Sequence, residues 1–120
     1  MGLTILLVDD DQILTEKTKN SLNWDSLGIG MVFTANNIHE AKGILKVYKV
    51  DILLCDVDMP MGSGLELVEW IREEGKDMKC IFLSSYANFT YAQKALRLGS
   101  VNYLLKPISN KDLELSLIHI

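Results

Sequence analysis

The chain has 120 residues, 48% of them hydrophobic, and this length supports one compact core and predicts a single domain over residues 1–120. Twelve basic residues against 16 acidic ones give a net charge of −4, which disfavours direct binding of this segment to nucleic acid. No uncharged stretch is long enough to cross a membrane, and Cys55 and Cys80 lie in apolar runs that suit reduced thiols, so we expect a cytoplasmic protein.

Short apolar runs alternate along the chain with longer segments whose apolar residues recur at helical spacing. The short runs lack strict alternation of apolar and polar residues, as expected for strands that are covered on both faces. The predicted strands are residues 4–8, 31–35, 51–55, 79–83 and 101–105.

A helix is predicted after each strand from apolar spacing and from residues that favour helix ends. Asn37 is a candidate N-cap with Glu40 three residues later, and Gly99 can end the fourth helix. The helical patterns cover residues 13–22, 41–48, 65–71 and 89–96 and a last segment that starts at 109.

Strands that alternate with helices imply right-handed crossovers, and therefore a parallel sheet with helices on both faces. We thus expect an α/β fold with five strands and five helices. In an open sheet of this kind, ligands bind beyond the carboxyl ends of the strands, near the point where the strand order reverses.

Polar residues follow the apolar strands at this carboxyl edge. They are Asp9, Asp10 and Asp11 after the first strand, Asp56 and Asp58 after the third, Ser84 after the fourth and Lys106 after the fifth. Carboxylates that lie close together repel one another, so they take up protons or share a cation. A hard divalent ion such as Mg²⁺ is the simpler remedy, with Asp10 and Asp56 as candidates for direct ligands.

A carboxylate can attack phosphorus and form an acyl phosphate, a transfer catalysed mainly by positioning and by neutralising oxygen charge. A metal ion, Lys106 and Ser84 would supply that neutralisation. Each residue alone also has an ordinary interpretation: the acidic triplet as a helix cap, Lys106 as a surface lysine and Ser84 as a hydroxyl bonded to its own backbone. The joint arrangement favours the chemical interpretation.

Four motifs in this order and spacing resemble the receiver domains of bacterial two-component response regulators. They are residues 7–11 (LVDDD), 56–60 (DVDMP), 83–86 (LSSY) and 103–107 (YLLKP). The resemblance covers essentially the whole chain, and Gly62 and Gly64 match the family's loop before the third helix. It implies a flavodoxin-like, doubly wound sheet with strand order 2-1-3-4-5.

The resemblance also assigns roles to the residues at the carboxyl edge. Asp56 would accept the phosphoryl group, and Lys106 would contact its oxygens. Ser84 would be the switch hydroxyl that moves to the phosphoryl group, and Tyr103 the switch aromatic that turns inward with it. The implied protein ligands of Mg²⁺ are Asp9, Asp10, Asp56 and the backbone carbonyl of Asp58. The family's peptide bond before Pro107 is commonly cis.

The partners implied by the resemblance are a sensor histidine kinase as phosphoryl donor and a second copy of the chain. Dimerisation would use the face formed by the fourth helix, fifth strand and fifth helix. Residues 85–108 look most like receivers that precede an AraC-type DNA-binding domain, which implies transcription as the output. The protein would then be a signalling switch rather than an enzyme.

Two positions depart from the most frequent family pattern. Ser85 replaces the usual glycine or alanine, and Asp58 places an acidic side chain two residues after the acceptor. Tyr86 is bulky enough to shield an acyl phosphate on Asp56 from water, so we expect it to slow hydrolysis.

Two other classes of protein compete with the receiver interpretation. Asp56 and Asp58 match the nucleophile motif of haloacid-dehalogenase-type phosphatases, but that family places the motif after its first strand and needs further downstream motifs. A pseudo-receiver that serves only as an interaction module is disfavoured by the presence of Asp10, Asp56, Ser84 and Lys106.

Overall fold

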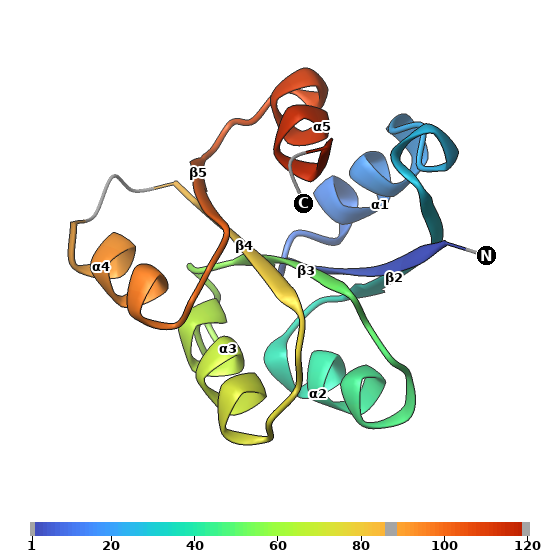
Figure 1. Ribbon diagram of the computed structural model, residues 1–120. Coiled ribbons are helices and arrows are strands. Elements are labelled where there is room, and N and C mark those ends of the chain that lie inside the picture. The colour runs from blue at the N-terminus through green and yellow to red at the C-terminus, as the bar shows by residue number, and fades with distance from the viewer. Residues whose placement is uncertain (1, 86–88, 119–120) are drawn as a thin grey trace.

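The computed structural model describes residues 2–85 and 89–118, in which five strands alternate with five helices (Figure 1). The strands are β1 (Leu3–Val8), β2 (Ile29–Ala35), β3 (Ile52–Asp56), β4 (Lys79–Ser84) and β5 (Asn102–Leu105). The helices are α1 (Gln12–Ser21), α2 (Ile38–Val47), α3 (Gly64–Glu73), α4 (Phe89–Arg97) and α5 (Asn110–Ile118), with a 3₁₀ turn, η1 (Asp25–Leu27), before β2. Within the described residues, no helix is long and apolar enough to span a membrane.

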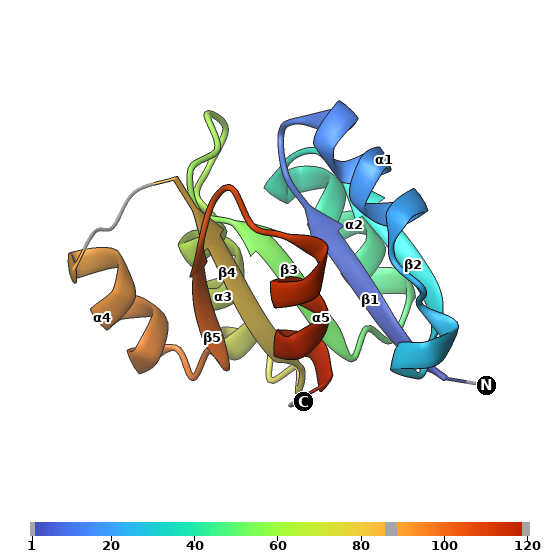
Figure 2. The same cartoon turned by 90° about the horizontal axis from the view of Figure 1, so that it is seen from above.

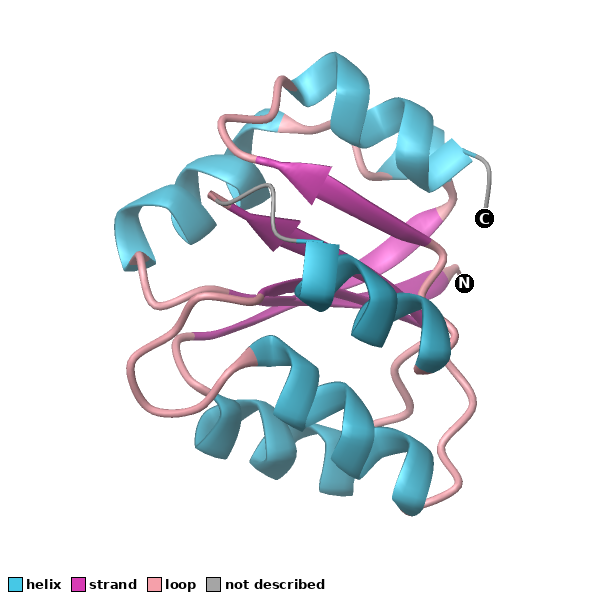
Figure 3. Ribbon diagram, turned by 90° about the vertical axis from the view of Figure 1, so that its left-hand side faces the viewer, coloured by secondary structure: helices cyan, strands magenta, loops and turns pink. Residues whose placement is uncertain are grey.

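All five strands run parallel in one sheet, in the order β2-β1-β3-β4-β5. Helices α1 and α5 lie on one face of the sheet, and α2, α3 and α4 lie on the other (Figures 1 and 2). Figure 3 shows the sheet between these two helical layers. The predicted doubly wound α/β fold and its strand order are confirmed. The order reverses at β1 and β3, so their carboxyl ends flank the expected ligand site.

The sheet divides the hydrophobic core in two, because successive residues of a strand point to opposite faces. Leu53 and Cys55 belong to the cluster under α2, α3 and α4, whereas Ile52 and Leu54 belong to the cluster under α1 and α5. Both faces of the central strands are therefore buried, which explains their unbroken apolar sequence. Cys55 and Cys80 are free thiols, and burial raises the pKa of both, that of Cys80 to about 11.

The helix ends form where the sequence indicates them. The Asp11 side chain caps α1 by accepting a 3.1 Å hydrogen bond from a backbone N–H three residues later. Asn37 caps α2 by accepting a 2.8 Å bond from the N–H of Glu40, whose own carboxylate accepts from the N–H of Asn36. After α4, Gly99 adopts a left-handed conformation with φ of 75°, which only glycine adopts readily.

Strand β2 begins at Ile29, two residues earlier than the sequence pattern predicts. Ile29 is buried and pairs with Leu3, and the register then shifts so that the next residue of β1 pairs with Met31. Gly28 and Gly30 flank Ile29 and remove the apolar pattern by which a strand is recognised. The irregular pairing around Gly30 thus extends β2 by residues that the sequence pattern does not indicate as a strand.

The Arg72 guanidinium ties α3 to the turn after α4 and to the segment before β4. Its Nε donates a 2.9 Å hydrogen bond to the carbonyl of Leu98, Nη1 a 3.0 Å bond to that of Met78 and Nη2 a 3.4 Å bond to that of Gly99. These carbonyls belong to the turn after α4 and to the segment that enters β4. The fork of donors on one planar group suits this joining of separate backbones.

We predict that Arg72→Met lowers the free energy of unfolding by about 1–3 kcal/mol, because three carbonyls lose their donor, two of them in partly buried hydrogen bonds. Urea denaturation followed by circular dichroism measures this change. The matched control is Arg97→Met, since Arg97 lies exposed on α4 and undergoes the same change of charge. Equal losses in the two variants would contradict the role given to Arg72.

Candidate functional site

Four strands deliver polar side chains to the carboxyl edge of the sheet. Asp9 follows β1, Asp56 ends β3, Ser84 ends β4 and Lys106 follows β5. Asp9, Asp56 and Ser84 are buried, whereas Asp10 is exposed. The structure brings the predicted residues together at one edge, while their chemical roles stay predictions at this point.

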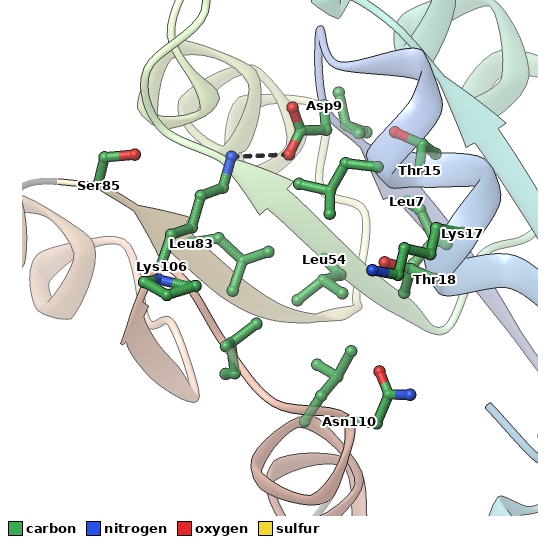
Figure 4. A pocket seen from close by; sticks show the side chains of 15 residues that line it. Leu7, Asp9, Thr15, Lys17, Thr18, Leu54, Leu83, Ser85, Lys106 and Asn110 are labelled. Atoms are coloured by element: carbon green, nitrogen blue, oxygen red, sulfur yellow. Dashed lines mark hydrogen bonds and ion pairs between the residues drawn. The ribbon is translucent and has the colours of Figure 1, made fainter. Parts of the chain in front are cut away.

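Lys106 is the counterion of the two buried carboxylates. Its Nζ lies 2.8 Å from Oδ2 of Asp9 and 3.1 Å from Oδ2 of Asp56. Figure 4 shows the lysine reaching from the strand-end segment after β5 to Asp9. Burial opposes the positive charge of Lys106, but its hydrogen bond to Asp9 and the charges of both aspartates outweigh this effect and raise its pKa. The amine therefore stays protonated.

Backbone amides fix the other oxygen of each buried carboxylate. Oδ1 of Asp9 accepts a 3.0 Å hydrogen bond from the N–H of Asp11, and Oδ1 of Asp56 accepts a 3.2 Å bond from the N–H of Asp58. Each carboxylate is thus held between an amide and the lysine. The Oδ2 atoms of the two aspartates face the same side, so that one charged group can contact both, as Lys106 does.

The balance of charges leaves Asp56 a weaker acid than usual. Burial raises its pKa most, the negative charge of Asp9 raises it further, and the charge of Lys106 and the N–H of Asp58 act in the opposite direction. The result is a shift of the pKa from 3.8 to about 6. One lysine is therefore insufficient to compensate the buried negative charge at this edge.

The acidic residues also fit a hard divalent cation. Ligand oxygens of Asp9, Asp10 and Asp56 all lie within 4.8 Å of one another. Among the described residues, the Asp10 carboxylate has no hydrogen bond or ion pair, so it is available as a ligand. Oxygen donors of this kind and number are what Mg²⁺ prefers. The backbone carbonyl of Asp58 remains a predicted fourth protein ligand.

The loop after β3 approaches Asp56 so closely that a side chain is excluded. A Cβ atom on Gly64 would overlap the carbonyl oxygen of Asp56 and lie 2.7 Å from Sγ of Cys55. The N–H of Gly64 also donates a 3.3 Å hydrogen bond to the carbonyl of Val57. The first turn of α3 is thereby held against the acidic edge, which gives a physical reason for glycine at this position.

The Asp58 side chain makes contacts that the sequence analysis missed. Its Oδ2 accepts a 2.8 Å hydrogen bond from the hydroxyl of Ser84 and a 3.2 Å bond from the N–H of Ser85. This carboxylate therefore points across from the loop after β3 to the end of β4. The only sequence signal was an acidic residue two positions beyond Asp56, which did not indicate a partner.

Three further expectations concern the surroundings of the site. Tyr103 is half-buried against the core cluster under α2, α3 and α4, and its movement stays a prediction. The peptide bond between Lys106 and Pro107 is cis, as the family resemblance implies. Tyr86, expected to shield Asp56 from water, lies outside the described residues.

A pocket of about 470 Å³ extends below the Asp9–Lys106 ion pair, between α1 and α5. Leu7, Leu54 and Leu83 line it from the sheet, and Lys17 and Asn110 line it from the helices (Figure 4). The leucines make the sheet side of this pocket apolar, and Asp9 and Lys106 also line it.

Comparison with protein families gives one match, to the response regulator receiver domain, over residues 5–118. Two relatives are the transcriptional regulatory protein YesN of Bacillus subtilis, 34% identical over 113 residues, and the Regulator of RpoS of Escherichia coli, 35% identical over 113 residues. Each alignment covers 94% of this chain but only 31% of YesN and 32% of the Regulator of RpoS. The chain thus spans about a third of these relatives.

A solved structure with the same fold is the REC domain of AraT, a response regulator from Geobacillus stearothermophilus. The TM-score is 0.89 and the sequence identity 32%, and the match covers 99% of this chain and 92% of the AraT domain. The similarity therefore extends over the complete sheet and its helices.

The raised pKa of Asp56 predicts a dependence of stability on pH in the absence of divalent ions. A carboxyl group with a higher pKa in the folded state binds protons more tightly there, so its contribution to stability falls as the pH rises from about 4 to about 6. Asp56→Asn removes this ionisation. We expect the variant to exceed the wild type in free energy of unfolding by about 2 kcal/mol at pH 8 and to lose this advantage at pH 4.

Urea denaturation in EDTA at the two pH values measures this difference. Asp77→Asn is the matched control, because Asp77 is exposed and lies away from the acidic edge. A variant Asp56→Asn that is less stable than the wild type at pH 8 would show that Lys106 already compensates the buried charge.

Proposed function

This chain belongs to the response regulator receiver domain family of two-component systems, and we propose that Asp56 accepts a phosphoryl group from a sensor histidine kinase. The observation that carries the proposal is the environment of Asp56. Its buried carboxylate ends β3 beside a protonated lysine 3.1 Å away and within reach of two further acidic residues. The protein would act as a signalling switch that promotes its own phosphorylation.

In the proposed reaction, a carboxylate oxygen of Asp56 attacks the phosphorus atom of a phosphohistidine. An O–P bond forms, the P–N bond breaks, and the electron pair of that bond leaves with the imidazole of the donor. The ammonium group of Lys106 binds a phosphoryl oxygen and neutralises part of its charge. The N–H of Asp58 holds Oδ1 of Asp56 and thereby orients the carboxylate.

We propose Mg²⁺ as the cofactor of this transfer, held by Asp9, Asp10, Asp56 and the backbone carbonyl of Asp58. When bound, the ion supplies positive charge to the phosphoryl oxygens and orients them. The aspartates offer oxygen ligands that cluster within 4.8 Å, which supports this assignment. Mutual repulsion of the buried carboxylates would also favour binding of the ion.

The proposed output surface is the α4-β5-α5 face. Ser84 and Tyr103 would respond to the phosphoryl group and alter this face, on which a second copy of the chain would bind. Exposed apolar side chains support such a contact, because a dimer would remove them from water. They are Leu96, Val101, Leu105, Leu115 and Ile118.

We further propose that the switch acts in the cytoplasm and controls transcription through an AraC-type DNA-binding domain. The two free, buried thiols support the cytoplasmic location. The similarity to YesN, a transcriptional regulatory protein, supports this output. The resemblance of residues 85–108 to AraC-type regulators supports it as well. Residues 1–120 would form the receiver unit of such a protein.

The first test is intact mass spectrometry after incubation with acetyl phosphate and Mg²⁺. We expect one phosphoryl group on the wild type and on the control Asp77→Asn, and none on Asp56→Asn, because the nucleophilic carboxylate is lost. Asp10→Ala should be modified much more slowly, since it loses a metal ligand. Undiminished modification of Asp56→Asn would contradict the assignment of the phosphoacceptor.

The same samples separate the competing functions. Turnover of phosphoesters would favour a phosphatase of the haloacid-dehalogenase type. A wild-type protein that neither carries a phosphoryl group nor turns over phosphoesters would favour a pseudo-receiver.

The second test concerns dimerisation. We expect sedimentation velocity to show dimers of the wild type in Mg²⁺ and beryllofluoride, and monomers of Leu96→Asp, because a charge in the apolar contact would have to be desolvated. Val47→Asp is the matched control, since Val47 is equally exposed but lies on α2. A wild type that binds beryllofluoride and stays monomeric would rule out this dimer for the isolated domain.

A further inference from the structure

The Asp58 carboxylate occupies a position from which it competes for the switch hydroxyl. It starts in the loop after β3 and accepts bonds from two donors at the end of β4, the Ser84 hydroxyl at 2.8 Å and the Ser85 N–H at 3.2 Å. Ser84 is completely buried, so its hydroxyl is shielded from water, whereas Ser85 is exposed. A hydrogen bond from a shielded hydroxyl to a charged acceptor is stronger than average.

We propose that Asp58 is a positioning residue that holds Ser84 and Ser85 in the unphosphorylated protein and releases them when Asp56 carries a phosphoryl group. The inference rests on the proposed function of Asp56. It assigns to the Asp58 side chain a role distinct from that of its backbone carbonyl, namely to set how readily the protein responds to the phosphoryl group.

The competition follows from the chemistry of a hydroxyl group, which carries a single proton to donate. If Ser84 donates that proton to Asp58, it cannot donate it to a phosphoryl oxygen on Asp56. The movement of Ser84 to the phosphoryl group must therefore break the 2.8 Å bond. The bond from Ser84 to the phosphoryl oxygen therefore contributes only the difference in free energy between the two hydrogen bonds.

Electrostatic repulsion favours the release. The N–H of Asp58 lies 3.2 Å from Oδ1 of Asp56, so its side chain starts close to the point where the phosphoryl group would be attached. That group adds about −1.5 to −2 charges at pH 7. The negative Asp58 carboxylate is repelled at the same time as Ser84 is offered a new acceptor.

The bond to the Ser85 N–H extends the effect to the backbone. This amide follows directly after β4, so Asp58 ties the end of that strand to the loop after β3. Loss of the carboxylate from this position breaks its bonds to the serine hydroxyl and to the amide together. A local change of charge is thereby coupled to the chain that leads toward α4.

The test is a titration with beryllofluoride at saturating Mg²⁺, followed by the ¹⁹F NMR signal of the bound group. We expect Asp58→Ala to lower the half-saturating concentration about three- to tenfold, because the Asp58 carboxylate no longer competes for the Ser84 hydroxyl. Asp58→Asn keeps an acceptor oxygen and should show a smaller decrease. The control Asp77→Ala should titrate like the wild type.

A double-mutant cycle distinguishes positioning from simple removal of a negative charge. In the Ser84→Ala background, the effect of Asp58→Ala should shrink to less than about twofold, since the shared hydroxyl is absent. An effect of full size in that background, or an unchanged titration of Asp58→Ala, would overturn the inference.

The Ser85 amide provides a readout that does not depend on the phosphoryl group. In ¹H–¹⁵N spectra of the unphosphorylated protein, we expect its proton signal to move upfield in Asp58→Ala and not in Asp77→Ala. An unmoved signal would contradict the contact itself. Failure of the wild type to bind beryllofluoride, with the expected movement of this signal, would instead refute the proposed function of Asp56.

Discussion

Negative charge crowded into a partly buried edge is the constraint on which the site depends. Parallel strands end side by side, so the aspartates after β1 and β3 meet at the point where the strand order reverses. Lys106 compensates part of their charge but leaves the pKa of Asp56 high. An edge with this excess of negative charge favours the binding of an additional cation, and such a cation would favour the ionised form of Asp56.

The groups around this edge come from separate elements, and each is held by a different neighbour. The amide of Asp58 orients Asp56, Gly64 allows α3 to approach it, and the side chain of Asp58 reaches Ser84. A change of charge on one carboxylate is therefore felt by two loops and one strand end. The fold thus brings contacts from separate elements together at one edge.

The sequence sufficed to predict the elements and the residues that gather at the acidic edge, because these depend on periodicity and on positions relative to strand ends. The strand order was predicted from the resemblance to the receiver family. It failed where the structure depends on particular contacts. The start of β2 at Ile29 is hidden between glycines, and η1 has too few residues to establish a period. The partner of the Asp58 carboxylate depends on the path of a loop, which residue types do not specify.

The guanidinium of Arg72 anchors the C-terminal end of α4. It holds the carbonyls of Leu98 and Gly99, directly after the C-terminal end of that helix, and at the same time the carbonyl of Met78. Any displacement of α4 that preserves these bonds must pivot about this end. A rotation of α4 about this end would displace its first residue, Phe89, the most.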